Sequence, residues 1–274
     1  MKIGLYCDVN GPVRGPHKVA KNLIAGLGKL GIDVSLNKTE DLTGCLHSGP
    51  YLYSLPRTTL LGPNILVTPP DDPRVWGLYT DIVVPSKWVQ DKYASFSLTK
   101  ANRLHIWSVG IDTDSFNDAN RDPTIDCLLY AKNKSPAMAE YLLKKKGMSY
   151  MTLTYGSYQE SDLIQALKKC RFCILCTGTE SQGIAYMEIL SSGLPCFVLD
   201  ETMWMGRFPA TSVPYFSEEC GVIARDPKQY EEFFNLFTNS ISSYHPREYI
   251  IGDHTLEKGA YRYMELLKFS HGVS

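Results

Sequence analysis

Two glutamates, Glu180 and Glu188, lie eight positions apart around the start of a predicted helix. Glu180 follows an apolar run that predicts a buried strand, Gly183 stands where the helix begins, and Glu188 lies inside it. In parallel α/β sheets, ligands bind where strands end and the next helices begin. Free amides at a helix start can bind a phosphate, and carboxylates accept hydrogen bonds from neighbouring hydroxyls. The eight-residue spacing is common on surface helices and means little alone, but its place between a buried strand and a helix start favours a ligand that carries both hydroxyls and phosphate.

A second loop of this kind, Asn10–Gly15, follows the first predicted strand and opens the first predicted helix. The helix amides behind Gly15 could receive an anion, and Arg14, His17 and Lys18 add positive charge or hydrogen-bond donors. A turn selected only for its geometry explains the loop equally well. The loop indicates a binding site only in combination with the segment around Glu180.

Two other patterns resemble known sites but lie in the wrong context. Gly26-Leu-Gly-Lys-Leu-Gly31 matches a dinucleotide fingerprint, yet it ends a predicted helix, where backbone carbonyls repel phosphate. Cys170, Cys173 and Cys176 have the spacing of an iron–sulfur run, but residues three apart on a strand point to opposite faces. We therefore predict no nicotinamide site and no metal site.

The elements that must position these residues alternate between short apolar runs and longer helical patterns, which is typical of βα units around a parallel sheet. The expected strands are Ile3–Cys7, Asp33–Leu36, Ile65–Thr68, Ile82–Val84, Leu104–Val109, Asp126–Ala131, Met151–Tyr155, Phe172–Cys176 and Cys196–Leu199. The expected helices are Pro16–Leu30, a helix after Pro85 to about Tyr93, Pro136–Lys146, Ser161–Cys170, Gly183–Ser192, Asp226–Phe237 and Thr255–Phe269. Residues 38–58 receive no assignment.

A turn-rich segment divides this alternation into two similar halves. Residues 110–123 are crowded with Gly, Asp, Asn and Pro and show no sustained period. We predict a first Rossmann-like domain over 1–110, a linker over 111–120, and a second Rossmann-like domain over 121–274. The ligand-binding glutamates belong to the second.

Composition and charge exclude several classes of protein. Of the 274 residues, 44% are hydrophobic and 21% charged, so the chain can build a sizeable core. A net charge of -1 supplies no general attraction to nucleic acid or to an anionic membrane. Apolar runs are too short to form a transmembrane segment, and Asp8 interrupts the start too early for a signal peptide. We expect a cytoplasmic protein without a nucleic-acid partner.

The Glu180 segment, Thr177–Cys196, resembles the Glu-x7-Glu motif of the retaining nucleotide-sugar glycosyltransferases of family 4. Three further stretches resemble that family in the same order, namely Val83–Tyr93, Val109–Phe116 and Cys220–Pro227. The likeness covers the chain from about residue 81 onward. It implies an α/β protein with the GT-B fold, in which two Rossmann-like domains with parallel sheets face each other, and a C-terminal helix that could cross back to the first domain.

The resemblance also implies roles for individual residues. Glu188 would hold the ribose hydroxyls of the donor nucleotide, and Glu180 would contact the transferred sugar. Donor contacts with the sugar and diphosphate are implied for Ser181, Gln182, Gly183 and Ile184. The resemblance implies no obligatory metal or cofactor, and it implies a nucleotide-diphosphate sugar as the donor substrate.

Two departures from the family put parts of this assignment in question. The family grips the diphosphate with an Arg and a Lys after the first strand of the second domain, where this chain has Lys132 and Lys134. Lysine offers a point charge rather than a bidentate fork, so the grip would differ in geometry. The first domain is also short, and His17, His47 or the loop Pro69–Asp72 could supply the sugar contact that a histidine often makes in relatives.

The resemblance implies a retaining glycosyltransferase, of hexosyltransferase type, that moves a sugar from a UDP- or GDP-sugar to a hydroxyl of a glycan or glycoconjugate. His17 and Glu180 are the expected catalytic residues, with Gly15, Lys132 and Lys134 in the donor site. Two alternatives stay open. One is a catalytically inactive protein that binds a sugar nucleotide, and the other is a GT-B epimerase that acts on a nucleotide sugar.

Overall fold

The computed structural model describes residues 1–10, 15–47, 50–64, 78–96 and 103–273. The expected strand Ile65–Thr68, the loop Pro69–Asp72 and the centre of the Asn10–Gly15 loop, with Arg14, lie outside these ranges. The chain forms two compact units, one made of 1–110 and 254–274 and the other of 111–253. The last 21 residues thus join the first unit, whereas the sequence boundaries leave them in the second domain.

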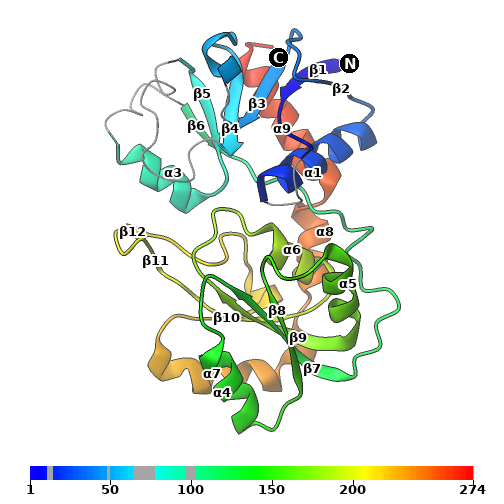
Figure 1. Cartoon of the computed structure of the whole chain (residues 1–274), viewed down its shortest axis with the longest axis vertical. Coiled ribbons are helices and arrows are strands. Elements are labelled where there is room, and N and C mark those ends of the chain that lie inside the picture. The colour runs from blue at the N-terminus through cyan, green and yellow to red at the C-terminus, as the bar shows by residue number, and fades with distance from the viewer. Residues whose placement is uncertain (11–14, 48–49, 65–77, 97–102, 274) are drawn as a thin grey trace. The chain divides into compact units, whose positions relative to one another are not determined.

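The first unit contains a six-stranded parallel sheet with the strand order β2-β1-β3-β4-β5-β6 (Figure 1). Its elements are β1 (Lys2–Tyr6), α1 (Gly15–Lys29), β2 (Asp33–Leu36), β3 (Thr43–His47), η1 (Pro50–Tyr53), β4 (Leu60–Asn64), β5 (Asp81–Val84), α3 (Lys87–Ala94), β6 (Arg103–Ile106) and α9 (Leu256–Ser270). The unassigned segment 38–58 contributes β3 because Cys45 and Leu46 are completely buried.

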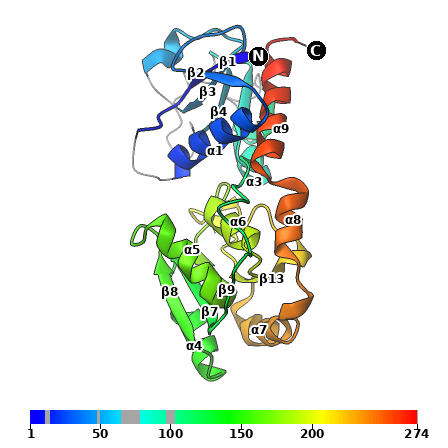
Figure 2. The same ribbon diagram turned by 90° about the vertical axis from the view of Figure 1, so that its right-hand side faces the viewer.

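Helix α9 lies alongside α1, as both views show (Figures 1 and 2). A methyl group added at Gly26 of α1 would stand 2.3 Å from the backbone oxygen of Leu256, so the two helices can approach this closely only with glycine there. The indole of Trp107 donates a hydrogen bond to the carbonyl of Gly259 at 2.8 Å. In the dinucleotide-like pattern, Gly26 thus serves helix packing, and Gly31, with a φ of +70°, follows the end of the helix.

The second unit contains a five-stranded parallel sheet with the order β13-β10-β9-β7-β8, and a separate two-stranded hairpin. Its elements are β7 (Ile125–Lys132), α4 (Ala137–Lys145), β8 (Tyr150–Thr154), α5 (Glu160–Lys169), β9 (Cys170–Thr177), α6 (Ile184–Ser191), β10 (Cys196–Leu199), β11 (Met203–Trp204), β12 (Phe208–Pro209), η3 (Glu218–Cys220), β13 (Gly221–Ala224), η4 (Pro227–Gln229), α7 (Tyr230–Asn239), η5 (Ile241–Ser243) and α8 (Pro246–Asp253).

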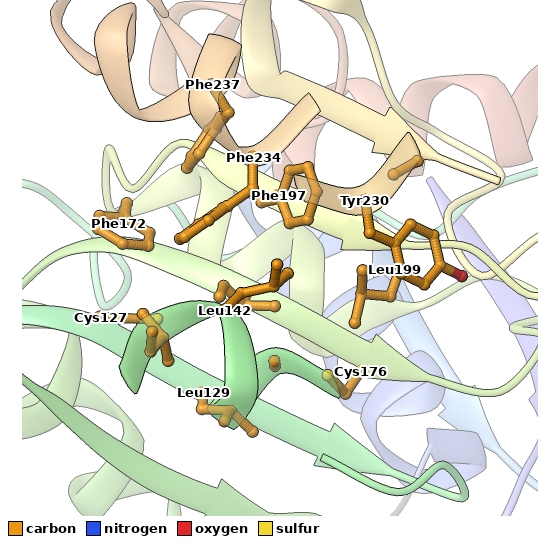
Figure 3. Close-up of a cluster of buried hydrophobic side chains, with 14 of the residues drawn as sticks. Cys127, Leu129, Leu142, Phe172, Cys176, Phe197, Leu199, Tyr230, Phe234 and Phe237 are labelled. Atoms are coloured by element: carbon orange, nitrogen blue, oxygen red, sulfur yellow. The ribbon is translucent and has the colours of Figure 1, made fainter. Parts of the chain in front are cut away.

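One face of this second sheet packs against α4 and α7 through a cluster of buried hydrophobic side chains, in which α7 contributes aromatic rings and α4 contributes alanine and leucine (Figure 3). The rings of Phe172 and Phe237 have centroids 5.5 Å apart, and those of Phe197 and Phe234 are 5.2 Å apart. Cys176 belongs to this cluster, whereas Cys173, three residues earlier on β9, does not. The three cysteines therefore occupy a buried strand, where alternation separates their side chains.

The expected α/β architecture with two parallel sheets is confirmed, and several element boundaries differ. Helix α5 ends at Lys169, so Cys170 begins strand β9 instead of closing a helix. The predicted helix from Asp226 starts as the short 3-10 helix η4, and the α-helix itself begins at Tyr230. Helix α8 and the hairpin β11–β12 were not expected. In the parts of the chain that the structure describes, every helix is too short or too polar to cross a membrane.

Candidate functional site in the second unit

The carboxyl ends of β7, β9 and β10 meet at one edge of the second sheet. Lys132, the last residue of β7, lies in register with Thr177, the last residue of β9. The loop after β9 carries Glu180, and its carboxylate pairs with the ammonium group of Lys132 at 2.7 and 2.9 Å. Two oppositely charged side chains from separate βα loops are therefore held at the edge where α/β proteins bind ligands.

Little water reaches this ion pair. The side chain of Lys132 is 23% exposed and that of Glu180 is 13% exposed. Burial raises the pKa of Glu180 above its ordinary value, and the charge of Lys132 and its hydrogen bond act in the opposite direction. The Lys132 ammonium also lies 4.4 Å from the centroid of the Tyr155 ring. A ligand that enters here meets charges that water screens only weakly.

Gly183 sets the start of α6 by adopting a left-handed conformation with φ of +80°. A methyl group at this position would stand 2.0 Å from the ring of Tyr186, so glycine is required for two independent reasons. The buried Tyr186 hydroxyl accepts from the backbone nitrogen of Tyr215 at 2.8 Å and donates to its carbonyl at 3.1 Å. The helix start is thereby fixed in place.

The other residues implied around Gly183 are largely buried. Gln182 and Ile184 flank the glycine and are 5% and 9% exposed, and Ser181 is half-buried. Glu188 lies in the second turn of α6 and is only 2% exposed. Burying an acidic side chain is costly unless polar groups surround it. Glu188 is therefore not an ordinary solvent-exposed residue of a helix surface.

Lys134 is not placed beside Glu180. Its ammonium group donates to the carbonyl oxygens of Leu199 and Asp200 at 2.9 and 3.3 Å, and lies 3.7 Å from the Glu201 carboxylate. It ties the loop after β7 to the end of β10. The structure thus brings together one of the two expected lysines with Glu180 and directs the other to backbone carbonyls.

Asp200, which follows β10, is a buried carboxylate that sequence reasoning missed. It accepts hydrogen bonds from the Ser212 backbone nitrogen at 2.7 Å and the Thr211 hydroxyl at 2.9 Å, and pairs with Arg225 at 3.1 Å. The carbonyl of Thr211 in turn accepts from the backbone nitrogen of Glu180 at 3.0 Å. An acidic residue directly after an apolar strand was the available signal.

The first unit has its own polar cluster, at the carboxyl ends of β1 and β3. His17 on α1 pairs with the Asp8 carboxylate at 3.3 Å, and His47 lies 3.4 Å from the backbone nitrogen of Asp8. A backbone hydrogen bond from Asn10, followed by the bond to His17, lowers the pKa of Asp8, whereas burial lowers the pKa of His47. Both candidate histidines therefore contact Asp8, His17 through its carboxylate and His47 through its backbone nitrogen, and Asp8 was not anticipated.

Gly15 begins α1, and a methyl group there would meet no atom within 4 Å. Among the residues with described coordinates, no three or more His, Cys, Asp or Glu side chains are grouped so that they could hold a metal ion.

No protein-family model matches this chain, and no curated protein matches it. Solved structures do. AviGT4, a glycosyltransferase involved in avilamycin A biosynthesis, superposes with a TM-score of 0.64 at 13% identity over 99% of this chain and 98% of its own. Sucrose-phosphate synthase from Thermosynechococcus elongatus gives a TM-score of 0.60 at 12% identity, with both chains covered completely at 100%.

A third similar structure is an alpha-glucosyltransferase solved with UDP and a 13-mer DNA containing a HMU base. It has a TM-score of 0.57 at 10% identity, over 98% of this chain and 99% of its own. At these identities the likeness establishes the fold. The chain has the GT-B fold of these glycosyltransferases, with two Rossmann-like units and parallel sheets.

Proposed function

We propose that this protein is a retaining glycosyltransferase that moves a sugar from a UDP- or GDP-sugar to a hydroxyl group of a glycan or glycoconjugate. The observation that carries the proposal is the Lys132–Glu180 pair beside the start of α6, on a fold shared end to end with known glycosyltransferases. The alpha-glucosyltransferase solved with UDP supports a nucleotide donor. The net charge of -1 favours a glycan over a nucleic acid as acceptor.

In this proposal, different charged groups bind the diphosphate, the ribose and the transferred sugar. When the bond from the anomeric carbon to the phosphate oxygen breaks, negative charge develops on the diphosphate, and the Lys132 ammonium and the first amides of α6 stabilise it. Lys134 would add a second charge only after leaving the carbonyls of Leu199 and Asp200. Glu188 would hold the ribose hydroxyls of the nucleotide.

Glu180 would have a different role from Glu188, because it lies beside Lys132, where negative charge develops on the diphosphate. Its carboxylate would accept hydrogen bonds from the transferred sugar and orient it, with Lys132 holding the carboxylate in place. The acceptor oxygen would form its bond on the face from which the phosphate departs. The acceptor proton would pass to the departing phosphate oxygen, so that the product keeps the anomeric configuration of the donor.

The first experiment is a thermal-unfolding panel of uridine, guanosine and adenosine diphosphate sugars. A donor present at ~100 times its dissociation constant should stabilise the protein by roughly 2.7 kcal/mol. One nucleotide should give this shift, and we expect uridine or guanosine. If none of the nucleotide sugars shifts the unfolding transition, the proposal is wrong.

The second experiment separates the two glutamates. Glu188→Gln should raise the dissociation constant of the donor roughly tenfold to a hundredfold, because hydrogen bonds to a charged group contribute about 1.5–3 kcal/mol. Glu180→Gln should mainly slow the release of sugar from the donor, by about a hundredfold, because its contact strengthens as charge develops. Glu232→Gln, an exposed carboxylate on α7, is the matched control and should change neither quantity.

Analysis of the products distinguishes the alternatives. A transferase releases the sugar to water or to an acceptor, and proton NMR should show the donor's anomeric configuration in the product. An epimerase would leave the altered sugar on its nucleotide. An inactive binding protein would form a stable complex and produce neither. Equal and unchanged activity in Glu180→Gln and Glu188→Gln would remove the site assignment.

A further inference from the structure

A short hairpin, Met203–Pro209, leaves the end of β10 in the second unit (Figure 1). Its turn closes with a hydrogen bond from the Arg207 backbone nitrogen to the Trp204 carbonyl at 3.1 Å, and Met205 and Gly206 both have positive φ, 51° and 64°. This is the geometry of a type I′ hairpin turn. A methionine in the left-handed region is strained, and Met205 is 73% exposed. Core packing therefore does not explain this residue.

The two strands carry a pair of facing aromatic rings. Trp204 and Phe208 are direct cross-strand partners, and their ring centroids lie 5.9 Å apart with an interplanar angle of 42°. The guanidinium carbon of Arg207 lies 5.1 Å from the Phe208 ring centroid. Both aromatic side chains are half-buried. The hairpin thus presents aromatic surface together with a planar group of hydrogen-bond donors.

The base of the hairpin is tied to the loop that carries Glu180. The Ser212 hydroxyl donates to the Thr177 carbonyl at 2.9 Å and accepts from the Glu201 backbone nitrogen at 2.9 Å. The Thr211 carbonyl accepts from the Glu180 backbone nitrogen at 3.0 Å, and the Ala210 backbone nitrogen donates to the Thr202 carbonyl at 2.9 Å. These bonds attach the base of the hairpin to the loop that carries Glu180, the residue to which we assign the transferred sugar.

We infer that the hairpin Met203–Pro209 binds the carbohydrate acceptor, with a pyranose ring packed on Trp204 and Phe208 and its hydroxyls facing Arg207. This inference rests on the proposed function, because it places the acceptor next to Glu180. The C–H groups on one face of a pyranose carry slight positive charge and pack well on the negative face of an aromatic ring. The five donors of a guanidinium suit neighbouring hydroxyl oxygens.

A membrane surface is the other occupant that an exposed Trp–Met–Phe hairpin could suggest, and the charges disfavour it. Attraction to anionic lipid needs a cluster of basic residues, whereas this hairpin carries only Arg207 and has Glu201 at its base. The whole chain has a net charge of -1. A carbohydrate therefore fits both the aromatic pair and the modest charge.

The test is binding to an array of immobilised oligosaccharides in the presence of UDP, with four variants. Trp204→Ala and Phe208→Ala should weaken binding at least about tenfold, because aromatic anchors carry a large share of binding energy. Trp204→Phe keeps an aromatic face and should retain most of the binding. Leu236→Ala removes a side chain that is 56% exposed on α7 and should behave like the unaltered protein.

Each outcome decides the inference. Loss in the two alanine variants, with retention in Trp204→Phe and Leu236→Ala, supports it. Unchanged array binding in the alanine variants overturns it, as does the absence of any bound oligosaccharide or a Trp204-dependent association with phosphatidylserine vesicles. Donor-induced thermal shifts should be the same in all variants, so a normal donor shift with unaltered oligosaccharide binding removes the hairpin assignment alone. The absence of any donor shift would instead remove the proposed function.

Discussion

Both units place an acid beside a base at the carboxyl edge of a parallel sheet, but they do so in different surroundings. In the second unit, Lys132 and Glu180 are 2.7 Å apart, and less than a quarter of either side chain is exposed. In the first unit, His17 and Asp8 are 3.3 Å apart, and the Asp8 side chain is 55% exposed. Water therefore screens the His17–Asp8 pair far more than the Lys132–Glu180 pair. The same sheet position therefore holds a shielded ion pair in one unit and an exposed His–Asp contact in the other.

The starts of the two helices differ in the same direction. Gly183 precedes α6 with a positive φ and the Tyr186 ring against its α-carbon, whereas Gly15 opens α1 with open space around it. The second unit is thus built tightly around its candidate site. The first unit has the corresponding residues without the same packing around its helix start.

The largest effect on stability is expected when Gly183 is replaced by alanine, and the same change at Gly15 serves as the comparison. Gly183→Ala should lower the free energy of unfolding by about 2–5 kcal/mol, from backbone strain of about 1–2 kcal/mol and overpacking against Tyr186 of about 1–3 kcal/mol. Gly15→Ala should keep the stability or raise it slightly. Urea unfolding of both variants measures the difference. Equal losses would contradict the contrast between the two helix starts.

Breaking the buried ion pair should have the next largest effect. Lys132→Met should lower the free energy of unfolding at pH 7 by about 2–3 kcal/mol, somewhat less than for a fully buried pair, because Glu180 loses its partner. The double variant with Glu180→Gln should recover part of this loss. Urea unfolding of the single and double variants measures both changes.

The same variants should differ in their pH dependence. The folded chain raises the pKa of Glu180, so between the ordinary and the raised pKa it binds a proton that the unfolded chain has released. Stability should therefore fall as the pH rises through this window. Lys132→Met should extend the fall to higher pH, because the Lys132 charge lowers this pKa. A pH profile that Lys132→Met leaves unaltered would show that the two groups are not coupled.

The smallest effect is expected at the exposed pair of the first unit. The pKa of Asp8 is lowered, so its contribution to stability is present above its ordinary pKa and is lost as the pH falls through the lowered value. Because solvent screens this carboxylate, Asp8→Asn should leave the thermal midpoint at pH 7 unchanged within error. A loss comparable to that of Lys132→Met would mean that the two edges are equivalent.

Short apolar runs in the sequence were sufficient to predict most of the parallel strands, and the clearest of them, β5, β9 and β10, are almost completely buried. This signal was insufficient where strands are short or lack such a run. β3 has the sequence Thr-Gly-Cys-Leu-His, with few apolar residues, and β11 and β12 have only two residues each. None of the three therefore shows a clear hydrophobic pattern in the sequence. Their existence depends on partners elsewhere in the chain.

The candidate site shows the same limit. The region of Glu180, Gly183 and Glu188 could be identified from spacing and from a family resemblance. The roles of Asp200 and Lys134 could not, because both depend on contacts with residues distant in sequence, such as Thr211, Arg225 and Leu199. Two lysines that look equivalent along the chain are separated only by the three-dimensional arrangement.

The position of α9 has a consequence for how the protein is made. The core of the first unit includes Tyr263 and Leu267, which are completely buried and come from the last helix, whereas the second unit is one uninterrupted stretch. As the nascent chain leaves the ribosome, the middle of the polypeptide can therefore finish folding before its beginning does. The amino-terminal sheet must wait, with part of its apolar surface uncovered, until the final helix emerges.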